Sequence, residues 1–463
     1  MKKNLIVLFL TFFLFTMAEA PRHSFSGTVT DASNGESLIG ASVTVQELPG
    51  TGITTNGYGY FSLTLPDGQY TFVVSYLGYA TQTIKIKLNT SLQQNVKLEP
   101  NATELEDVII TAQARNNNIT STEIGMEKLE IKEINKIPVI FGEADILKTL
   151  KLTPGIKSVG EASGGFFVRG GNNSQNLVLL DEATVYNADH LLGFFSTFNS
   201  DAIKDIQMFK GTAPAEYGGR ISSVLDVKMN DGNNQSHHVG GGIGLISSRL
   251  NAEGPLVKDK GSYLVTARRT YADLFLKLSP DTLINNNQLY FYDLNLKLNY
   301  KIDDKNRIFL SGYFGRDIFE FQDRFGIDWG NITGTLRWNH LWSEKLFSNT
   351  SVIYSNYDYR VNLSQDAGFS LHSVIKNWNL KHEFQLFANS RNTISFGLSS
   401  AFHIITPGQV ETTGDSDFTA VRLQNKNSVD NALYISNVWK PTPKLNINYG
   451  LRFSAYHLFG PGD

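Results

Sequence analysis

The sequence predicts a mainly β protein in three parts: an N-terminal β-sandwich, a mixed α+β segment, and the first part of a large antiparallel transmembrane β-barrel. Two observations lead to this prediction. Short stretches of alternating apolar and polar residues fill residues 22–100, and ten longer alternating runs follow residue 235. The 40 Gly residues and the aromatic share of 12% suit strands and turns better than long helices.

The composition excludes several classes of protein. Lys and Arg number 41 and Asp and Glu 44, so the net charge is −3. Without a basic surplus we expect no nucleic-acid partner. The chain has no Cys, which excludes disulfides, thiolate metal sites and cysteine nucleophiles.

Residues 1–20 have the pattern of a secretory signal peptide. Lys2 and Lys3 precede an apolar run that is too short to cross about 30 Å of hydrocarbon. Ala18 and Ala20 fit cleavage after Ala20, but Pro21 suits that step poorly, so cleavage after Ala18 stays open. We therefore expect export and leave this segment out of the fold.

Residues 22–100 predict a small antiparallel sandwich of about seven short strands. The turn dipeptides Asn34-Gly35, Asn56-Gly57 and Asp67-Gly68 separate the alternating bursts. The stretches 27–31, 38–43 and 57–61 resemble the carboxypeptidase regulatory-like domain. That resemblance implies a prealbumin-like accessory sandwich without catalytic residues, although an adhesive sandwich fits this segment as well.

No catalytic residue, metal site or cofactor is predicted. The sequence lacks the His-Glu-x-x-His pattern of zinc peptidases. The neighbouring His237 and His238 could ligate a metal, but two histidines in a polar loop are more often solvated. We therefore expect a protein that is not an enzyme.

Residues 101–122 predict a flexible linker with one β-prone island. Such an island is either a stray strand or a segment that a partner pairs with by strand addition. Here it resembles a TonB box, the segment by which outer-membrane transporters are engaged from the periplasm. The residues that would bind TonB are Glu106, Asp107, Val108, Ile109, Ile110 and Thr111.

Residues 123–233 resemble the plug domain of TonB-dependent outer-membrane receptors. A short amphipathic helix at 144–150 ends at Pro154-Gly155, and five further segments match the family in order at 166–170, 176–181, 209–211, 216–220 and 223–228. Two positions depart from the family pattern. Glu182 stands where Gly is usual, and Lys210 stands where Arg is common.

The resemblance also implies functional residues in the plug. Arg169 and Lys210 would pair with glutamates of the barrel wall and lock the plug, since buried charges need partners. Both could instead be ordinary surface charges. The outward loops would contact the ligand, although polar loops of this kind are also common bland turns. These loop residues are Asn172, Asn173, Ser174, Tyr186, Asn187 and His190.

Residues 235–463 predict long strands joined alternately by short turns and longer connections, the pattern of an outer-membrane barrel. Aromatic residues near the strand ends suit the interfacial girdles. They are Trp338, Trp342, Tyr354, Tyr357, Tyr359 and Trp439. Ten strands cannot enclose a plug, because barrels that hold one need about twenty-two. We therefore expect that more than half of the barrel is missing from this sequence.

The order of these parts is typical of Bacteroidetes-type TonB-dependent receptors. The resemblance implies an outer-membrane protein that imports a siderophore, cobalamin, an oligosaccharide or a peptide. Its implied partners are TonB with the inner-membrane energising complex, outer-membrane lipid and the ligand, with a surface lipoprotein left open. The alternative is a surface adhesion or signalling receptor that binds without transport.

Overall fold

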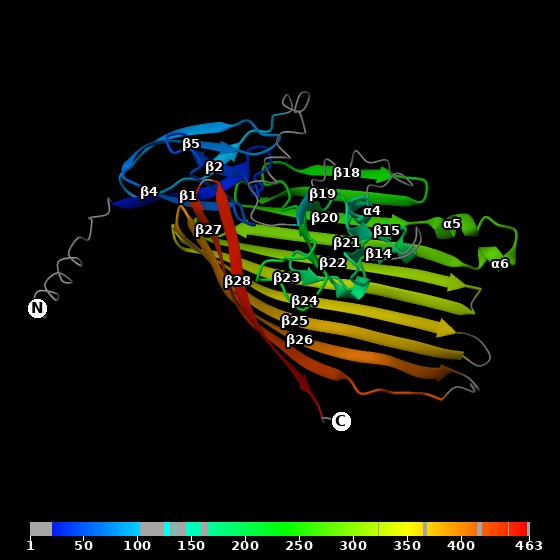
Figure 1. The fold of residues 1–463 in the computed structure, drawn as a ribbon. Coiled ribbons are helices and arrows are strands. Elements are labelled where there is room, and N and C mark those ends of the chain that lie inside the picture. Colours follow the sequence, from blue (N-terminus) through cyan, green and yellow to red (C-terminus); the bar gives the residue numbers. More distant parts are fainter. Residues whose placement is uncertain are drawn as a thin grey trace, which may run out of the picture.

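The computed structural model of the chain describes residues 21–101, 125–129, 134, 145–158, 165–322, 324–363, 368–413, 419–442 and 444–460. The predicted signal peptide (1–20) and the predicted TonB box (106–111) lie outside the described residues, so both stay predictions. Figure 1 shows three parts: a small β-rich part in blue, a middle part in teal, and a broad curved sheet from green to red.

The N-terminal part is the expected sandwich, except that it is not wholly antiparallel, because β1 pairs in parallel with β7 and β8. One sheet has the order β3-β2-β5-β6, and in the other β1 pairs with β4, β7 and β8. Phe25, Phe61 and Phe72 are fully buried between the sheets, with ring centroids 4.4–5.2 Å apart for the pairs that Phe25 makes. The strands are β1 (Arg22–Asp31), β2 (Ser42–Val45), β3 (Gly52–Thr54), β4 (Tyr60–Pro66), β5 (Gly68–Ser75), β6 (Gln82–Leu88), β7 (Leu92–Gln93) and β8 (Val96–Leu98).

The middle part, here called the plug, is built on a five-stranded mixed sheet of order β13-β12-β17-β16-β9. Asp145 caps the short helix α4 by accepting from the Lys148 amide, and its other oxygen accepts from the Ser196 amide. The sheet strands are β9 (Met126–Leu129), β12 (Asn176–Leu180), β13 (Ala183–Thr184), β16 (Ile203–Phe209) and β17 (Ser223–Met229). The smaller elements are α4 (Ile146–Lys151), β10 (Ile156–Lys157), β11 (Phe167–Val168), η3 (Asn173–Gln175), β14 (Asp189–His190), η4 (Leu191–Gly193) and β15 (Phe195–Ser196).

The turn between β12 and β13 explains the departure from the family pattern at Glu182. Leu180 pairs with Ala183, so Asp181 and Glu182 alone form a two-residue turn. Both have positive φ, 46° and 74°, a region that glycine adopts far more easily. The chain therefore holds two acidic side chains at the tip of a strained turn, and that strain requires compensating contacts.

The C-terminal part, here called the wall, is one antiparallel sheet of eleven strands in sequence order. The strands are β18 (His238–Ile243), β19 (Ser247–Val257), β20 (Gly261–Thr270), β21 (Gln288–Lys301), β22 (Asn306–Phe321), β23 (Phe325–Ser343), β24 (Leu346–Leu363), β25 (Gly368–Asn389), β26 (Asn392–Thr413), β27 (Lys426–Thr442) and β28 (Leu445–Phe459). Two short helices, α5 (Ala272–Leu276) and α6 (Thr282–Asn285), lie in the connection from β20 to β21.

The wall has an inverted polarity, with apolar side chains outside and polar side chains inside. On β21, Leu294 is 44% exposed while its neighbours Asn295 and Lys297 are each 1% exposed. The same alternation exposes Leu310, Leu336, Leu398 and Leu433 on other strands. A sheet with this alternation suits lipid on its outer face and a polar interior, as the sequence predicted.

Three details of the wall differ from the sequence predictions. The predicted run 240–250 is divided between β18 and β19, because the chain turns at 244–246, so the wall has eleven strands instead of ten. The connection expected at 407–429 is shorter, since β26 continues to Thr413. Tyr357 lies against the plug residue Tyr186, with ring centroids 6.3 Å apart, and not in an outer girdle.

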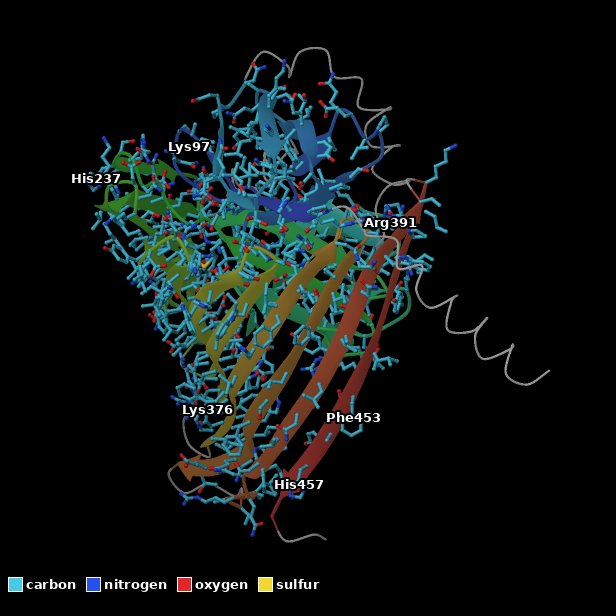
Figure 2. All side chains as sticks on the ribbon, turned by 90° about the vertical axis from the view of Figure 1, so that its left-hand side faces the viewer. Lys97, His237, Lys376, Arg391, Phe453 and His457 are labelled. Atoms are coloured by element: carbon cyan, nitrogen blue, oxygen red, sulfur yellow. The ribbon has the colours of Figure 1, made fainter. Side chains whose placement is uncertain are left out.

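The sandwich lies at the end of the wall where the short turns gather (Figure 1). Helices α5 and α6 lie at the opposite end, and the plug rests against the concave inner face between the two ends. Figure 2 shows His237 and Arg391 near the sandwich and Lys376 and His457 at the far end. No helix among the described residues is long and apolar enough to cross a membrane.

Candidate functional site at the plug–wall interface

The β12–β13 turn carries the first buried contact between plug and wall. The Lys297 Nζ of β21 lies 2.6 Å from Asp181 Oδ2 and 3.5 Å from Asp231 Oδ1, and it donates to the Met229 carbonyl oxygen at 3.2 Å. Lys297 and Asp181 are 1% and 2% exposed. A buried ammonium with three oxygen partners is well satisfied, and removal of either side would leave an unpaired buried charge.

The neighbouring residue Glu182 makes the second contact. Its Oε1 lies 3.6 Å from Arg337 Nη1 and accepts from Asn349 Nδ2 at 3.0 Å and from the Tyr58 hydroxyl at 3.1 Å. Burial raises the pKa of Glu182, but Lys381 and Arg337 outweigh burial and lower the pKa to about 2. One carboxylate therefore joins the plug, the wall and the sandwich.

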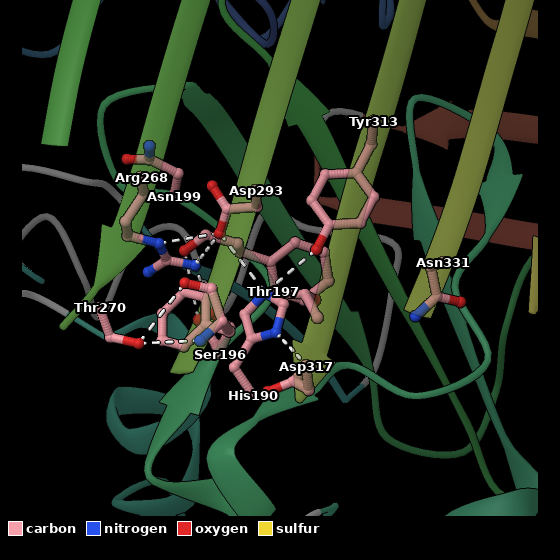
Figure 3. Close-up of polar contacts among 12 residues, drawn as sticks. His190, Ser196, Thr197, Asn199, Arg268, Thr270, Asp293, Tyr313, Asp317 and Asn331 are labelled. Atoms are coloured by element: carbon pink, nitrogen blue, oxygen red, sulfur yellow. Dashed lines mark hydrogen bonds and ion pairs between the residues drawn. The ribbon is translucent and has the colours of Figure 1, made fainter. Parts of the chain in front are cut away.

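His190 centres a third contact (Figure 3). It belongs to β14, which lies on the side of the plug away from the sandwich (Figure 1). Its Nδ1 lies 2.6 Å from Asp317 Oδ2 of β22, and its Nε2 lies 3.4 Å from Asp293 Oδ2 of β21. The ring stacks on Phe291 with centroids 4.1 Å apart. The Arg268 guanidinium binds the same Asp293 oxygen at 2.6 Å and donates to the Ser196 carbonyl oxygen at 2.8 Å.

The two carboxylates favour a charged His190. Burial alone would lower its pKa, but the charges of Asp317 and Asp293 and their hydrogen bonds outweigh burial and raise the pKa to about 9. The imidazolium then bridges two wall strands from the plug. Its neighbour Asp189 accepts from the Gly165 amide inside the plug, and burial raises the Asp189 pKa to about 6.

The sandwich joins the same network through Glu36. Its Oε1 accepts from the Asp231 amide at 2.5 Å and lies 3.9 Å from Lys204 Nζ of β16. Lys204 Nζ lies 3.4 Å from Asp231 Oδ2. The wall residue Arg307 donates to the Ser37 hydroxyl of the sandwich at 3.0 Å. The three parts of the chain are therefore connected through one group of buried charges.

The two residues expected to lock the plug take other positions. Lys210 Nζ pairs with Glu127 of β9 and donates to the Pro154 carbonyl oxygen at 3.0 Å, so both of its partners belong to the plug. Arg169 is exposed, with its Nη1 2.9 Å from where a Cβ on Gly211 would lie. Among the described residues neither pairs with a wall glutamate, and their locking role stays a prediction.

The expected ligand residues divide into two groups. Asn172, Asn173 and Ser174 are exposed around the single turn η3, which the Asn172 amide caps by donating to Gln175 Oε1 at 2.9 Å. Tyr186 and Asn187 bond to Asn331 of β23 through their main-chain atoms, at 3.2 and 2.8 Å.

His190 departs furthest from its expected place, since it is 1% exposed and serves the plug–wall contact described above. The structure thus brings Tyr186, Asn187 and His190 against the wall and leaves the 172–174 loop open. Their ligand role stays a prediction.

The histidine pair of the polar loop bonds within the protein. His237 Nδ1 lies 3.1 Å from the Tyr263 hydroxyl, and His238 Nε2 lies 2.8 Å from the Ser236 hydroxyl. The described residues contain no group of three or more His, Cys, Asp or Glu side chains that could hold a metal ion.

The sequence reasoning missed the residues that hold the plug. These are Asp181, Glu182 and Asp231 of the plug, and Arg268, Asp293, Lys297, Asp317 and Arg337 of the wall. A signal was present in the strands, because Lys297 is a charge on the inward side of the alternating run Leu294-Asn295-Leu296-Lys297-Leu298. An inward charge in such a run indicates a buried partner.

Comparison with protein families identifies two domains in the chain. Residues 25–110 match the CarboxypepD_reg-like domain, and residues 134–224 match the TonB-dependent receptor plug domain. A curated relative, TonB-dependent receptor P3 of Formosa agariphila, is 30% identical over 92 residues. That alignment covers 20% of this chain and 9% of the relative.

Solved structures share the fold at low sequence identity. The siderophore receptor PirA of Acinetobacter baumannii aligns with a TM-score of 0.56 at 16% identity, over 75% of this chain and 58% of that chain. The ferric citrate transporter FecA in its unliganded form aligns with a TM-score of 0.54 at 12% identity, over 74% and 57%. This chain therefore spans less than three fifths of the length of those two proteins.

The matched domains and the fold are similar to the same kind of protein. The N-terminal sandwich matches the accessory domain, the middle sheet matches the plug, and the wall aligns with part of an outer-membrane barrel. The order of the parts is the Bacteroidetes-type arrangement that the sequence predicted. The chain thus contains a CarboxypepD_reg-like domain followed by a TonB-dependent receptor plug domain, and its fold is similar to that of solved siderophore receptors.

Proposed function

We propose that this protein imports a bulky ligand across the outer membrane by TonB-dependent active transport. The supporting observation is the plug, which rests inside the wall and is held there by buried ion pairs from Asp181, Glu182 and His190. A seated plug blocks diffusion, and several buried pairs are costly to separate. Import past such a plug therefore needs energy from outside the outer membrane, which TonB would supply.

We assign a separate role to each segment of the chain. Residues 22–100 form the accessory sandwich, 101–122 the linker with the TonB box, 123–233 the plug and 235–463 the wall. The match to the CarboxypepD_reg-like domain continues to residue 110 and thus includes Val108, Ile109 and Ile110. We infer that this strand can pair with TonB by strand addition, so that a pull acts directly ahead of β9 of the plug.

The ligand remains one of four classes: a ferric siderophore, cobalamin, an oligosaccharide or a peptide. The solved relatives are described as receptors for siderophores and as a transporter of ferric citrate. At 16% identity or less, these likenesses carry over the fold and leave the ligand open. A surface lipoprotein that delivers the ligand is compatible with the exposed 172–174 loop.

A photo-crosslinking amino acid at Val108 tests the proposal without knowledge of the ligand. In energised cells we expect a covalent adduct with TonB, and we expect deletion of residues 106–112 to abolish TonB recovery with the chain. The matched control places the crosslinker at Lys97, an exposed residue of β8. No TonB adduct at Val108 would favour a surface adhesion or signalling receptor over a transporter.

A second measurement addresses the membrane setting. Outer-membrane fractions are separated with and without boiling, because folded barrels migrate differently once they are denatured. We expect a heat-modifiable species. A species whose migration does not change on boiling would contradict the barrel and with it the transport proposal.

A further inference from the structure

The connection between β20 and β21, residues 271–287, exposes several large apolar side chains at the end of the wall opposite the sandwich (Figure 1). They are Leu274, Phe275, Leu278, Leu283 and Ile284, here called the apolar patch, and they are 50%, 49%, 79%, 58% and 41% exposed. A surface in water usually exposes such side chains singly. A group of them close together therefore indicates an interaction surface.

Helix α5 turns a polar side chain toward the wall and apolar side chains away from it. Asp273 is 4% exposed, and its Oδ2 lies 3.5 Å from Arg269 Nη2 of β20. The helical turn continues past α5, since the Leu278 amide donates to the Phe275 carbonyl oxygen at 3.2 Å. Leu278 follows Leu274 by four residues and Phe275 by three, spacings that place side chains on one side of a helical segment.

Arg269 places α5 on the outer face of the wall. Its neighbour Arg268 points inward, where it donates to the Ser196 carbonyl oxygen of the plug. Successive side chains of a strand point to opposite faces, so Arg269 points outward. Its guanidinium carbon lies 5.1 Å from the centre of the Tyr290 ring, which in turn lies 6.4 Å from the Tyr292 ring. Helix α5 therefore begins beside a row of outward aromatic rings.

The outer face changes from apolar to polar at this level. Tyr290 of β21 lies opposite Ile318 of β22, and Leu294 continues the apolar face toward the sandwich. One step further from the sandwich, the outward pair is Gln288 and Glu320, whose side chains bond to each other. Rows of aromatic residues mark the edges of the apolar band in membrane barrels. Helix α5 thus stands where the lipid-facing surface ends.

Polar contacts fix the rest of the connection. Asp281 caps α6 by accepting from the Leu283 amide at 2.8 Å. Gln322, at the end of β22, donates through its side chain to the Leu283 carbonyl oxygen at 3.2 Å and through its amide to Asn287 Oδ1 at 2.9 Å. The connection therefore has a defined shape without burying the apolar patch.

We propose that the apolar patch binds the outer membrane itself, with the connection 271–287 lying at the membrane surface and its apolar side chains inserted among the lipids beside β20 and β21. The patch continues the lipid-facing side of the wall, which favours lipid over a protein partner. A segment of this kind is stabilised by the apolar area that it removes from water. The inference does not depend on ligand import, because a receptor that binds without transport has the same outer face.

Spin labels test the proposal, because the chain has no native Cys. A nitroxide is attached at Leu278→Cys and, as an independent reporter on α6, at Leu283→Cys. The matched controls are Leu294→Cys on the outer face of the wall, where Leu294 is 44% exposed, and Leu77→Cys in the sandwich, where Leu77 is 53% exposed. The full-length protein is reconstituted into vesicles of phosphatidylethanolamine and phosphatidylglycerol. Collision rates of each label with oxygen and with a water-soluble nickel chelate are then measured.

The two collision reagents separate lipid from water, because oxygen concentrates among lipid chains and the charged surroundings of the chelate keep it in water. We expect oxygen collisions to exceed nickel collisions by about threefold or more at Leu278→Cys and Leu283→Cys, as at Leu294→Cys. At Leu77→Cys nickel collisions should dominate. All four positions hold the same residue, so the comparison isolates the surroundings of the label.

Two results would overturn the proposal. Nickel collisions at Leu278→Cys and Leu283→Cys as frequent as at Leu77→Cys would place the apolar patch in water. Few collisions with either reagent would mean that a protein surface covers it, such as a second copy of the chain. Either result with Leu294→Cys still in lipid rejects the lipid contact of the patch alone and leaves the transport proposal intact, whereas nickel access at Leu294→Cys contradicts the barrel.

Discussion

The two sides of the wall face one plug but contact it in different ways. Along β20–β23, here called the latched arc, Lys297 is 1% exposed and its partner Asp181 2%. Along β25–β28, here called the open arc, the side chains of Lys381 and Glu383 pair within one strand at 3.4 Å and stay 17% and 20% exposed. The presence of an ion pair therefore does not by itself restrain the plug, because burial decides what each pair contributes.

Among the substitutions that test this comparison, we expect the largest loss of plug stability at Lys297. The variant Lys297→Met leaves Asp181 and Asp231 as buried carboxylates without their ammonium partner, which we expect to destabilise the plug by about 3–5 kcal/mol. Thermal unfolding in detergent, followed by protease cleavage of the plug, measures the loss. The control is Lys301→Met on the same strand, whose pair with Asp304 at 2.6 Å is exposed and contributes at most about 1 kcal/mol. Equal losses in the two variants would contradict the latched arc.

A smaller effect is expected from pH at His190. Its pKa is raised from 6.5 to about 9, so its stabilising contribution is fully present below pH 6.5 and is lost as the pH rises through about 9. The full contribution is on the order of 3 kcal/mol. The protection factor of the Leu191 amide, which donates to Asp317 at 2.7 Å, should fall over this range once the intrinsic pH dependence of amide exchange is removed. In His190→Gln this dependence should disappear, and its persistence would assign the effect to another group.

Two substitutions of Glu182 separate the stability that its side-chain contacts contribute from the cost of its strained backbone. Glu182→Ala removes the contacts to Arg337, Asn349 and Tyr58 and keeps a Cβ at positive φ, and we expect a loss of roughly 2 kcal/mol. Glu182→Gly removes the same contacts and also relieves the backbone, so it should be about 1 kcal/mol more stable than the alanine variant. Unfolding midpoints of the two variants give the difference. Identical midpoints would show that the turn is not strained.

The smallest effect is expected on the open arc. Lys381→Met removes a partly exposed partner of Glu383 and one of the two basic groups that lower the Glu182 pKa, and we expect a loss of about 1 kcal/mol because Arg337, Asn349 and Tyr58 still contact Glu182. The same thermal assay, run beside Lys297→Met, provides the comparison. A loss as large as that of Lys297→Met would mean that the two arcs restrain the plug equally.

Much of the fold could be predicted from local sequence. Strands of the wall follow from alternation, because each Cβ points to the opposite face from its neighbour, so the apolar set had to share one face. The helix at 146–151 follows from its Asp145 cap and the Pro154-Gly155 stop. Errors occurred where periodicity gives no sign of a turn, as at 244–246, or of a strand end, as beyond Ile405.

Fewer residues of the candidate site than of the fold could be predicted from the sequence. Family resemblance directed attention to the basic residues Arg169 and Lys210. The described contacts instead pair the acidic turn 181–182 with basic wall residues, and His190 with acidic wall residues. Residues 181 and 297 are 116 positions apart, and which charges meet depends on how the plug is rotated inside the wall. No local pattern encodes that rotation.

Local sequence is enough to predict the three-part organisation and the apolar face of the wall, because these depend on periodicity and on residues close together in the chain. Only the folded structure shows which charges pair and that His190 is buried between Asp293 and Asp317. The physical reason is that a buried charge is stabilised only by partners brought within a few ångströms, and folding chooses those partners from distant parts of the chain.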